Sequence, residues 1–254
     1  MLSIAERHKY ILDTLKHKGY AKVNEMAEKL DVTPATIRND FKTLEEQKLL
    51  YRTHGSASPV NPFRADMEVS EKGKINTAEK IRIGRAAAKL LDSGDSIILG
   101  AGSTIDIFAR QIPDGADLTV VTTSPRISLQ LHNHPSIDVI QLGGVLRKSS
   151  MTVTGEYTNL FLDSVNCSKL FLGVDGIDLE FGITNSNMEE ALLNAKMIES
   201  SVRVIVLADS SKFSRRGFGK VCQLDKVDVI VTDDGVSPAI VKSLEDMGID
   251  VIQA

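Results

Sequence analysis

The exposed face of a predicted helix that starts at Pro34 carries side chains of the kinds that recognise DNA. Its apolar residues Ile37, Phe41 and Leu44 recur at helical spacing and must face inward, which leaves the opposite face free for contacts. In a major groove, arginine suits guanine, asparagine suits adenine, and small or methyl-bearing side chains fit thymine. The residues of this helix and its cap that we predict to contact bases or phosphates are Thr33, Ala35, Thr36, Arg38, Asn39 and Lys42.

The elements before this helix have the order of a helix-turn-helix. Residues 25–30 are predicted to form a short first helix and residues 31–32 a tight turn. Thr33 is a good N-cap, because its hydroxyl accepts a free backbone N–H of the first turn, and the proline after it needs no such donor. Two short helices joined by a turn also occur in ordinary helical bundles, so a purely structural interpretation stays open at this point.

A short wing is predicted after the second helix. Residues 50–54 alternate in polarity and end at Gly55, which is typical of a short strand pair. We predict that Arg52 and His54 in this wing reach the DNA backbone or a minor groove.

Charge is distributed unevenly along the chain. Residues 1–56 hold ten Lys and Arg against eight Asp and Glu, a balance of +2, whereas the whole chain is −4, so the remainder is −6. Because phosphate neutralisation dominates DNA affinity, one domain at +2 should bind weakly and salt-sensitively. Two such domains would double the contacts, so we expect a homodimer or homotetramer on double-stranded operator DNA, with half-sites one helical turn or a multiple apart.

Length and composition indicate an ordinary two-domain protein. The chain has 254 residues, of which 42% are hydrophobic and 25% charged. It has no apolar stretch long enough for a signal peptide or a membrane span, so we expect a cytoplasmic protein that does not contact a membrane. Cys167 and Cys222 lie far apart, without the spacing of a metal site, and are predicted to be free thiols in or near a core. We expect neither a metal nor a cofactor.

Three segments follow from these patterns. Residues 1–57 are predicted to form the winged helix-turn-helix, here called the head. Residues 58–77 contain Pro59 and Pro62 with no clear period and are predicted to be a linker. Residues 78–254 are predicted to form an α/β domain for effector sensing and oligomerisation, here called the body.

The body alternates helices with strands, which indicates a largely parallel sheet. Residues 80–91 form an amphipathic helix pattern. The predicted strands have nearly continuous apolar runs, as expected where helices cover both faces of the sheet; they are residues 96–99, 118–122, 138–142, 169–173, 202–208 and 227–232.

Five loops at the ends of these strands carry small and hydroxyl-bearing residues suited to binding an anion. Ligands of open α/β sheets sit at the carboxyl ends of the strands, where backbone amides, hydroxyls and a lysine such as Lys212 can hold phosphate oxygens. Each loop alone is weak evidence, because small residues commonly just end strands, but their joint occurrence favours an anion site. The residues predicted to bind the ligand are Gly100, Ala101, Gly102, Ser103, Thr104, Thr122, Thr123, Ser124, Gly143, Gly144, Asp175, Asp209 and Lys212.

The first of these loops resembles a dinucleotide-binding turn only in part. Gly100 and Gly102 match its first two glycines, but Ile105 stands where the third belongs, and residues 120–121 offer no acid for a ribose. No Walker-type phosphate loop occurs in the sequence either. The pattern argues against NAD and favours a smaller phosphorylated ligand.

Taken together, these motifs resemble the DeoR family of bacterial transcriptional regulators over nearly the whole chain. In the head, the resemblance rests on TIRND (36–40), LEEQ-x-LL (44–50) and R-x-HG (52–55). In the body, it rests on LGAGST (99–104), VTTS (121–124), LGGVL (142–146), FLGVDGI (171–177), FGIT (181–184), ADSSKF (208–213) and VTD (231–233). Ser56, Gly100 and Thr123 depart from the family's usual glycine, aspartate and asparagine.

The resemblance implies a body similar in fold to ribose-5-phosphate isomerase and CoA-transferase proteins, which senses a phosphorylated sugar or related metabolite. It adds Thr184 of FGIT to the expected ligand-binding residues. It also implies a repressor of a carbohydrate-catabolism operon that the ligand releases from DNA, although the sequence itself does not give the sign of the response.

Two other functions fit parts of the sequence. Asp175 and Asp178 have the D-G-x-D spacing of an isomerase acid pair, which could serve proton transfer. However, Phe181 stands before the Gly-rich loop where the isomerase has a lysine, so an isomerase-like enzyme with a DNA-binding appendage is the less favoured alternative. A purely architectural DNA-binding protein would not need so large an α/β body.

Overall fold

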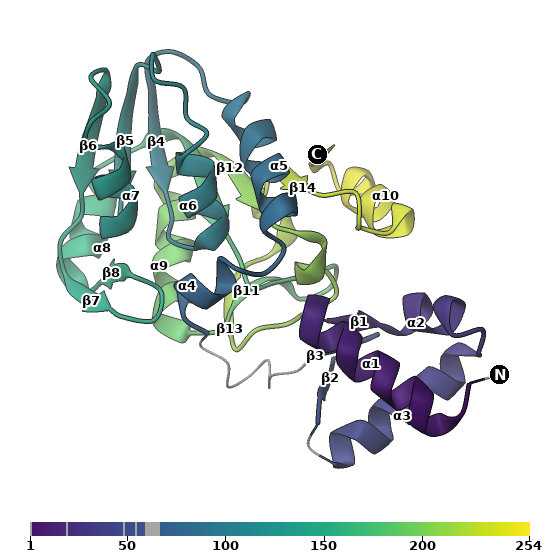
Figure 1. Ribbon diagram of the computed structural model, residues 1–254. Helices are drawn as coiled ribbons and strands as arrows, with labels where there is room; N and C mark the ends of the chain where they lie inside the picture. The colour runs from purple at the N-terminus through teal and green to yellow at the C-terminus, as the bar shows by residue number, and fades with distance from the viewer. Residues whose placement is uncertain (1, 19, 48, 54, 59–66) are drawn as a thin grey trace.

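The head is a compact three-helix unit with a small antiparallel sheet. In the computed structural model, which describes residues 2–18, 20–47, 49–53, 55–58 and 67–254, the head precedes the body and contacts it at one end (Figure 1). Its elements are α1 (Ile4–Lys18), β1 (Ala21–Lys22), α2 (Val23–Lys29), α3 (Pro34–Glu46), β2 (Tyr51–Thr53) and β3 (Ser56–Ser58).

The predicted start of α3 is confirmed. The backbone N–H of Thr36 donates to Thr33 Oγ1 at 3.2 Å, and Pro34 occupies the first turn. Ile37, Phe41 and Leu44 are fully buried against α1 and α2, as their spacing predicts. Burying each such side chain is worth about 1.5–3 kcal/mol, which fixes the face that α3 turns outward.

The wing is also confirmed as a strand pair. Strands β2 and β3 are antiparallel around Gly55, whose φ of +76° lies in the left-handed region that favours glycine. Strand β1, which the sequence did not predict, pairs with β3 and so ties the wing to the start of α2.

The body is built on a seven-stranded sheet in the order β15-β14-β12-β9-β4-β5-β6, and every neighbouring pair is parallel. The predicted α/β class is therefore confirmed. The six predicted strands are β4 (Asp95–Leu99), β5 (Leu118–Thr122), β6 (Ile137–Gln141), β9 (Cys167–Gly173), β12 (Ser201–Leu207) and β14 (Val229–Thr232). The edge strand β15 (Asp250–Gln253) was missed, because its half-exposed side chains lack the apolar run of a buried strand.

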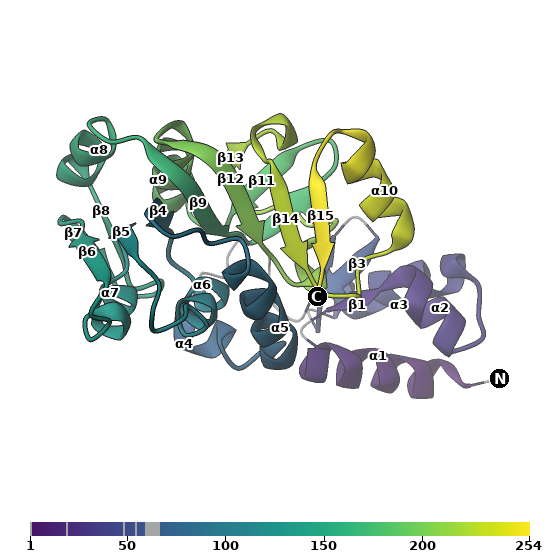
Figure 2. The ribbon, with the colours of Figure 1, turned by 90° about the horizontal axis from the view of Figure 1, so that it is seen from above.

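Helices cover both faces of this sheet (Figure 2). One face packs against α5 (Thr77–Ala88), α6 (Ser103–Ala109) and α7 (Pro125–Leu131), and the other against α8 (Glu156–Leu162), α9 (Met188–Glu199) and α10 (Pro238–Asp246). Neighbouring residues Ile97 and Ile98 of β4 point into the two different cores, and both are fully buried. A strand buried on both faces accounts for the continuous apolar runs.

Two small antiparallel units, also unpredicted, extend from the carboxyl end of the sheet. They are the hairpin β7 (Val145–Arg147) and β8 (Thr152–Thr154), and the sheet β10 (Gly176–Asp178), β11 (Gly182–Asn185) and β13 (Gly219–Cys222). Their strands are only three or four residues long. Gly182 is required between β10 and β11, because a Cβ there would lie 2.2 Å from the Cys222 carbonyl oxygen.

Part of the segment predicted as linker packs on the body. Helix α4 (Val69–Lys72) is a single turn, and the backbone N–H of Val69 donates to the Ser149 carbonyl at 2.7 Å. The buried ammonium of Lys80 on α5 donates to the carbonyls of Lys72 at 2.5 Å and Ile75 at 2.6 Å, which fastens the end of this turn. The four residues of α4 are too few to show a helical period, so the sequence did not predict this helix.

The two cysteines are free thiols, Cys167 buried and Cys222 half-buried, as predicted. Among the described residues, no helix combines the length and apolar composition needed to cross a bilayer.

Candidate functional site

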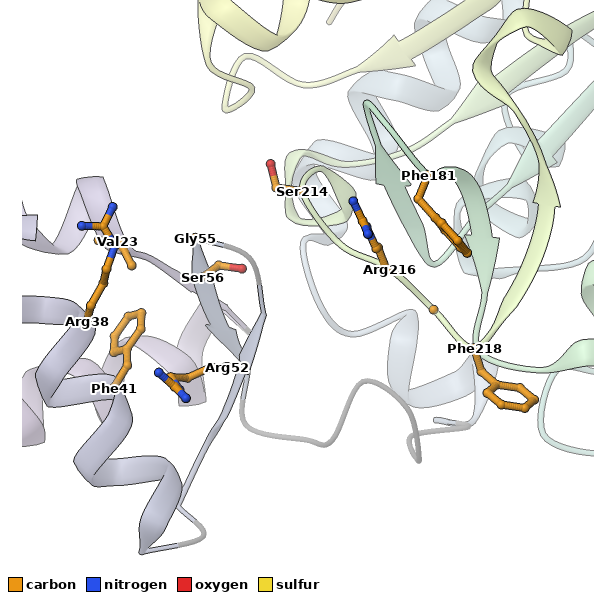
Figure 3. Close-up of a pocket in the computed structure, with 11 residues that line it drawn as sticks. Val23, Arg38, Phe41, Arg52, Gly55, Ser56, Phe181, Ser214, Arg216 and Phe218 are labelled. Atoms are coloured by element: carbon orange, nitrogen blue, oxygen red, sulfur yellow. The ribbon is translucent and has the colours of Figure 1, made fainter. Parts of the chain in front are cut away.

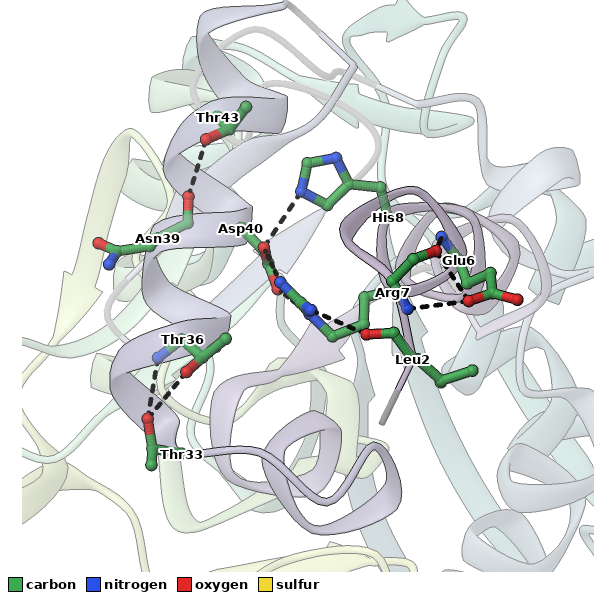
Figure 4. Close-up of polar contacts among 10 residues, drawn as sticks. Leu2, Glu6, Arg7, His8, Thr33, Thr36, Asn39, Asp40 and Thr43 are labelled. Carbon is green, nitrogen blue, oxygen red and sulfur yellow. Dashed lines mark hydrogen bonds and ion pairs between the residues drawn. The ribbon is translucent and has the colours of Figure 1, made fainter.

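The predicted DNA-reading face of α3 is open to solvent. Ala35, Arg38, Asn39 and Lys42 are exposed, and Thr36 is half-buried. Figure 4 shows Asn39 on the side of the helix opposite Asp40 and Arg7, with Thr33 and Thr36 at the start of the helix. Their contact with DNA stays a prediction, but α3 exposes Ala35, Arg38, Asn39 and Lys42 to solvent together.

Asp40, within the same TIRND motif, faces the other way. Its carboxylate accepts hydrogen bonds from Arg7 Nε at 2.8 Å and from Arg7 Nη2 at 3.0 Å. His8 Nε2 lies 3.2 Å from Asp40 Oδ1 (Figure 4). Arg7 and Asp40 are both buried. The motif is therefore divided between residues that can touch DNA and one that fixes α3 to α1.

Arg52 of the wing is held by α3. Its backbone N–H donates to Glu45 Oε1 at 2.8 Å and its Nε to Glu45 Oε2 at 2.5 Å. Burial opposes ionisation of Glu45, but these hydrogen bonds outweigh it and lower the pKa of that carboxyl. Arg52 stays exposed, so its remaining N–H groups face solvent beside the recognition helix. His54 lies outside the described residues.

A crevice of about 720 Å³ separates the recognition helix from the body. Arg38, Arg52 and Ser56 line it from the head, and Phe181 and Arg216 line it from the body (Figure 3). The side chain predicted to read bases therefore stands opposite the small sheet of the body.

The body contains a second, more enclosed cavity of about 50 Å³ at the carboxyl end of the parallel sheet. Parts of three segments predicted to bind the ligand meet helix α4 there. The predicted residues that line it are Ala101, Gly102, Ser103, Thr104, Asp175 and Lys212, and the others are Met67, Val69, Lys72, Ser150, Gly173, Val174, Asn185 and Glu190.

Other predicted ligand residues lie outside this lining and make structural contacts. Thr122 Oγ1 donates to the Leu99 carbonyl at 2.9 Å, and the hydroxyls of Thr123 and Thr152 are 3.0 Å apart. The Gly143 carbonyl accepts from Thr158 Oγ1 at 2.7 Å. The remaining members of this group are Gly100, Ser124, Gly144, Thr184 and Asp209, and of these Ser124 and Thr184 are fully buried.

Two of those positions depart from the family pattern. Gly100 packs so closely that a Cβ would lie 3.1 Å from Leu172 Cδ1, and Thr123 is fully buried. Neither position lines the cavity.

Asp175 is the centre of charge in the cavity. It accepts from Lys72 Nζ at 2.8 Å and from the Ser186 N–H at 3.0 Å and hydroxyl at 2.7 Å. Burial favours the neutral acid, but the positive charges of Lys72 and Lys212 dominate and hold the pKa of Asp175 far below its usual range. The carboxylate is ionised and oriented.

Lys212 and Asp209 lie at the two ends of one short turn, η1 (Ser210–Lys212) with its preceding cap. Burial lowers the pKa of Lys212, and the carboxylate of Asp209 partly offsets that effect. Asp209 accepts from Asn76 Nδ2 at 3.0 Å and from the Ser211 N–H at 3.0 Å. Burial opposes its charge, yet Lys212 and these contacts keep the pKa of Asp209 low.

Sequence reasoning missed the contribution of Lys72. It lies in the segment predicted as linker, so neither a strand end nor a helical period marked it. Ser150 and Asn185 were missed for a related reason, because they belong to short antiparallel units whose position depends on long-range packing, and Glu190 lies in the first turn of α9 without a strand-end signal. Glu190 is paired with Arg147 at 2.7 Å.

The two carboxylates of the D-G-x-D pattern do not meet in this cavity. Asp178 accepts from the backbone N–H groups of Glu180 at 3.0 Å and Phe181 at 2.8 Å and from Arg216 at 2.8 Å. It therefore closes the β10–β11 turn, whereas Asp175 lines the cavity.

The head touches the body beside the same turn that carries Lys212. The Tyr20 phenol lies beside the Ser210 side chain, which partly offsets the rise that burial causes in the pKa of Tyr20, and Lys22 Nζ donates to the Gly235 carbonyl at 3.2 Å. The Ser210 N–H in turn donates to Asp233 Oδ1 at 2.6 Å. One short turn thus faces the cavity on one side and the head on the other.

Comparisons with known proteins agree with this division. Residues 7–62 match the model of a DeoR-like helix-turn-helix domain, and residues 75–234 match that of the DeoR C terminal sensor domain. The HTH-type transcriptional regulator YulB of Bacillus subtilis (strain 168) is 37% identical over 248 residues, covering 98% of this chain and 96% of that protein.

Two further relatives have names that state a regulatory role. The putative aga operon transcriptional repressor of Escherichia coli O157:H7 is 33% identical and covers 98% of this chain and 93% of its own length. The glycerol-3-phosphate regulon repressor of Escherichia coli (strain K12) is 29% identical, with 95% of each chain covered.

Solved structures match more weakly. Ribose 5-phosphate isomerase A from Neisseria gonorrhoeae is 19% identical, with a TM-score of 0.40 and 53% of this chain and 52% of that chain covered. The beta subunit of eIF2B from Chaetomium thermophilum is 14% identical, with a TM-score of 0.42, 59% of this chain and 47% of that chain. Both TM-scores are below 0.5, so the fold class rests on the parallel sheet itself.

Proposed function

Because this chain belongs to the DeoR family of transcriptional regulators, we propose that it represses a carbohydrate-catabolism operon and that a phosphorylated sugar bound in the body changes its affinity for operator DNA. The observation that carries the proposal is the meeting of Lys72, Asp175 and Lys212 in one cavity. Relatives that match the chain along nearly its full length are named as repressors of the aga operon and the glycerol-3-phosphate regulon.

The chemistry of the cavity suits a sugar phosphate. Lys72 and Lys212 supply positive charge for phosphate oxygens, and the ionised Asp175 can accept hydrogen bonds from sugar hydroxyls. Ser150 and Asn185 also line the cavity, and Ser150 Oγ and Asn185 Oδ1 are buried atoms without a hydrogen-bond partner in the part of the chain that the structure describes. Since Asp178 lies elsewhere, we assign Asp175 a binding role and no catalytic one.

We propose that the arrangement of head and body described here is one of two states. A recognition helix enters a major groove about 12 Å wide and 8.5 Å deep, so DNA must reach Arg38 through the crevice that the body shares. Binding of a duplex therefore requires the head to move away from the β10–β11 hairpin. A ligand that prefers one of the two arrangements would shift operator affinity by the ratio of its affinities for them.

The contact between Tyr20 and Ser210 provides the route for that coupling. Ser210 and Lys212 belong to the same three-residue turn, so a ligand that moves Lys212 also moves the partner of Tyr20. Tyr20 directly precedes β1, whose residues pair with β3 of the wing. A shift in the turn would therefore reach the wing through one tyrosine and one strand.

We propose that the chain assembles as a homo-oligomer through an apolar surface around α8 and α9. Val145, Tyr157, Leu160 and Leu192 are large apolar side chains that are more than half exposed there, beside a groove of about 440 Å³. Apolar surface gathered in this way marks a contact site. A second copy would supply a second head, and two heads would bind DNA more tightly than one head with a charge of only +2. Leu192→Glu should reduce the mass measured by light scattering to that of one chain.

The test of the function is fluorescence anisotropy with a DNA fragment from upstream of the gene's own operon, titrated with sugar phosphates. The wild type should bind the fragment, and one of the sugar phosphates should change its affinity. Lys212→Ala should lose that response while binding DNA without ligand as the wild type does, because a charge-assisted contact to the anion is missing.

Lys242→Ala is the matched control, since Lys242 is exposed on α10 away from the cavity lining. It should respond like the wild type. A Lys212→Ala protein that responds at the same ligand concentration would exclude Lys212 as an anion contact, and a wild type that ignores every sugar phosphate would refute the proposed effector class.

A further inference from the structure

A separate cavity of about 240 Å³ lies on the other side of helix α4. It is enclosed by α4, the start of α5, α6 and Arg126 of α7. Val69 of α4 and Ser103 of α6 line both this cavity and the smaller one that holds Asp175. One turn of helix is therefore the partition between them.

Asp106 lines the larger cavity with a carboxylate that is only half satisfied. The residue is 5% exposed, and its Oδ2 accepts from Arg126 Nε at 2.7 Å. Its Oδ1 is buried and has no hydrogen-bond partner among the described residues. A buried acceptor left unpaired costs about 1–3 kcal/mol, and more when it is charged, so this atom calls for a donor. Burial outweighs Arg126 and raises the pKa of Asp106.

The sizes of the two cavities indicate where that donor comes from. A cavity of about 50 Å³ holds little more than an anion, whereas small-molecule sites usually measure about 300–1,000 Å³. With the α4 partition displaced, the two cavities together approach the lower end of that range. The joined space would have Lys212 and Asp175 at one end and Asp106 at the other.

We propose that the effector site extends beneath α4 and that Asp106 forms a second subsite, which accepts a hydrogen bond from a hydroxyl at the end of the ligand remote from its anionic group. This inference rests on the proposed function, since it assumes a phosphorylated polyhydroxyl ligand at Lys212. Arg126 occupies Oδ2 of Asp106, so that Oδ1 is the oxygen left to accept from a ligand. In the state described here, Lys72 of α4 pairs with Asp175, and this ion pair holds the partition in place.

Helix α4 is fastened by contacts at both of its ends. The Val69 N–H donates to the Ser149 carbonyl, and Lys72 pairs with Asp175. The Lys80 ammonium donates to the carbonyls at the end of the turn. A ligand anion beside Lys72 would compete with Asp175 for its ammonium. The Lys80 contacts lie at the end of the turn, where they can act as a pivot while Val69 moves.

Isothermal titration calorimetry on the full chain tests the subsite with two kinds of probe. Inorganic phosphate reports on the anion end alone, and a set of pentose and hexose phosphates reports on the whole site. Asp106→Ala removes the acceptor, and Ser70→Phe fills the second cavity from α4 while leaving the Asp106–Arg126 pair intact. Ser70→Ala is the matched control, because it keeps the cavity open.

For a sugar phosphate that binds the wild type, both Asp106→Ala and Ser70→Phe should weaken binding by about tenfold or more, since each removes the distal contact. Their affinity for inorganic phosphate should stay that of the wild type, as should both affinities of Ser70→Ala. The Ser70→Phe result also keeps the test valid if Asp106→Ala fails to fold.

Three outcomes would overturn the subsite. Unchanged sugar phosphate binding in Ser70→Phe and Asp106→Ala would refute it and leave the proposed effector class standing. An equal loss of inorganic phosphate would place Asp106 at the anion end instead. A wild type that binds phosphate but no sugar phosphate would refute both the effector class and the subsite.

Discussion

The head and the body use charged side chains in opposite ways. On the outward face of α3, Arg38 and Lys42 are exposed and come from consecutive turns of one helix. In the body, Lys72, Asp175 and Lys212 come from three distant segments, and Asp175 and Lys212 each have a pKa shifted by burial and by neighbouring charges. The head presents charge to a partner that brings its own counter-charge, whereas the body must balance charge internally until a ligand arrives. The difference implies that substitutions in the body will change conformation and pH dependence, and those on the head's surface will change only DNA binding.

The largest exception to this contrast is the buried ion pair of the head. Asp40→Ala would leave Arg7 buried without its carboxylate, and breaking such a pair costs about 3–5 kcal/mol. We expect a loss of that size in the free energy of unfolding of the head, measured by urea denaturation of the full chain. Glu45→Ala, which breaks the exposed pair with Arg52, should cost less than about 1 kcal/mol. Equal losses in the two variants would mean that Asp40 is not a structural residue.

The next effect concerns the buried lysine behind α4. Burial, reinforced by the charges of Lys212 and Lys72, lowers the pKa of Lys80 from its ordinary 10.5 to about 8. Between these values the unfolded chain keeps a proton that the folded chain has lost, so the free energy of unfolding should rise with pH across this window. The whole rise is at most about 3.5 kcal/mol, because each pKa unit is worth about 1.4 kcal/mol.

Lys80→Met removes this titration. The stability of the wild type relative to Lys80→Met, from urea denaturation, should therefore increase as the pH is raised through the window. Lys74→Met, at an exposed lysine of the same segment, should run parallel to the wild type. A constant difference between wild type and Lys80→Met would show that the buried ammonium does not titrate there.

The same contrast explains what the sequence could predict. The Thr33 cap and the stripe of Ile37 and Phe41 are local patterns, so the recognition helix and its outward face were predicted residue by residue. The strands of the body were predicted because burial on both faces leaves continuous apolar runs. Of the residues that line the cavity, the sequence predicted only those in the loops that follow the strands. Lys72 and Asn185 reach it through a one-turn helix and a short hairpin strand, whose positions depend on packing against residues far away in the chain.

A smaller effect is expected from the exposed residues of α3. Arg38→Ala should relax base preference and cost about 1–3 kcal/mol of operator binding, without changing the melting temperature. Lys42→Ala, as a phosphate contact, should instead weaken operator and random DNA alike and reduce the salt slope by about one. Anisotropy on both DNAs at several salt concentrations separates the two roles. Arg38→Ala with wild-type affinity for both DNAs would remove it from the reading face.

The smallest effect should come from the residue that joins the two regions. Tyr20→Phe keeps the ring and removes only the hydroxyl that interacts with the Ser210 side chain. Because one hydrogen bond contributes about 0.5–1.5 kcal/mol, the effect of a sugar phosphate on operator affinity should shrink by roughly threefold to tenfold. Operator binding without ligand and ligand binding without DNA should change less, since Tyr20 lies on neither the DNA-reading face nor the cavity lining. Tyr51→Phe on β2 is the matched control and should keep the full response. If Tyr20→Phe keeps it as well, the signal passes between body and head by another contact, and Lys22 with its bond to the Gly235 carbonyl becomes the residue to test.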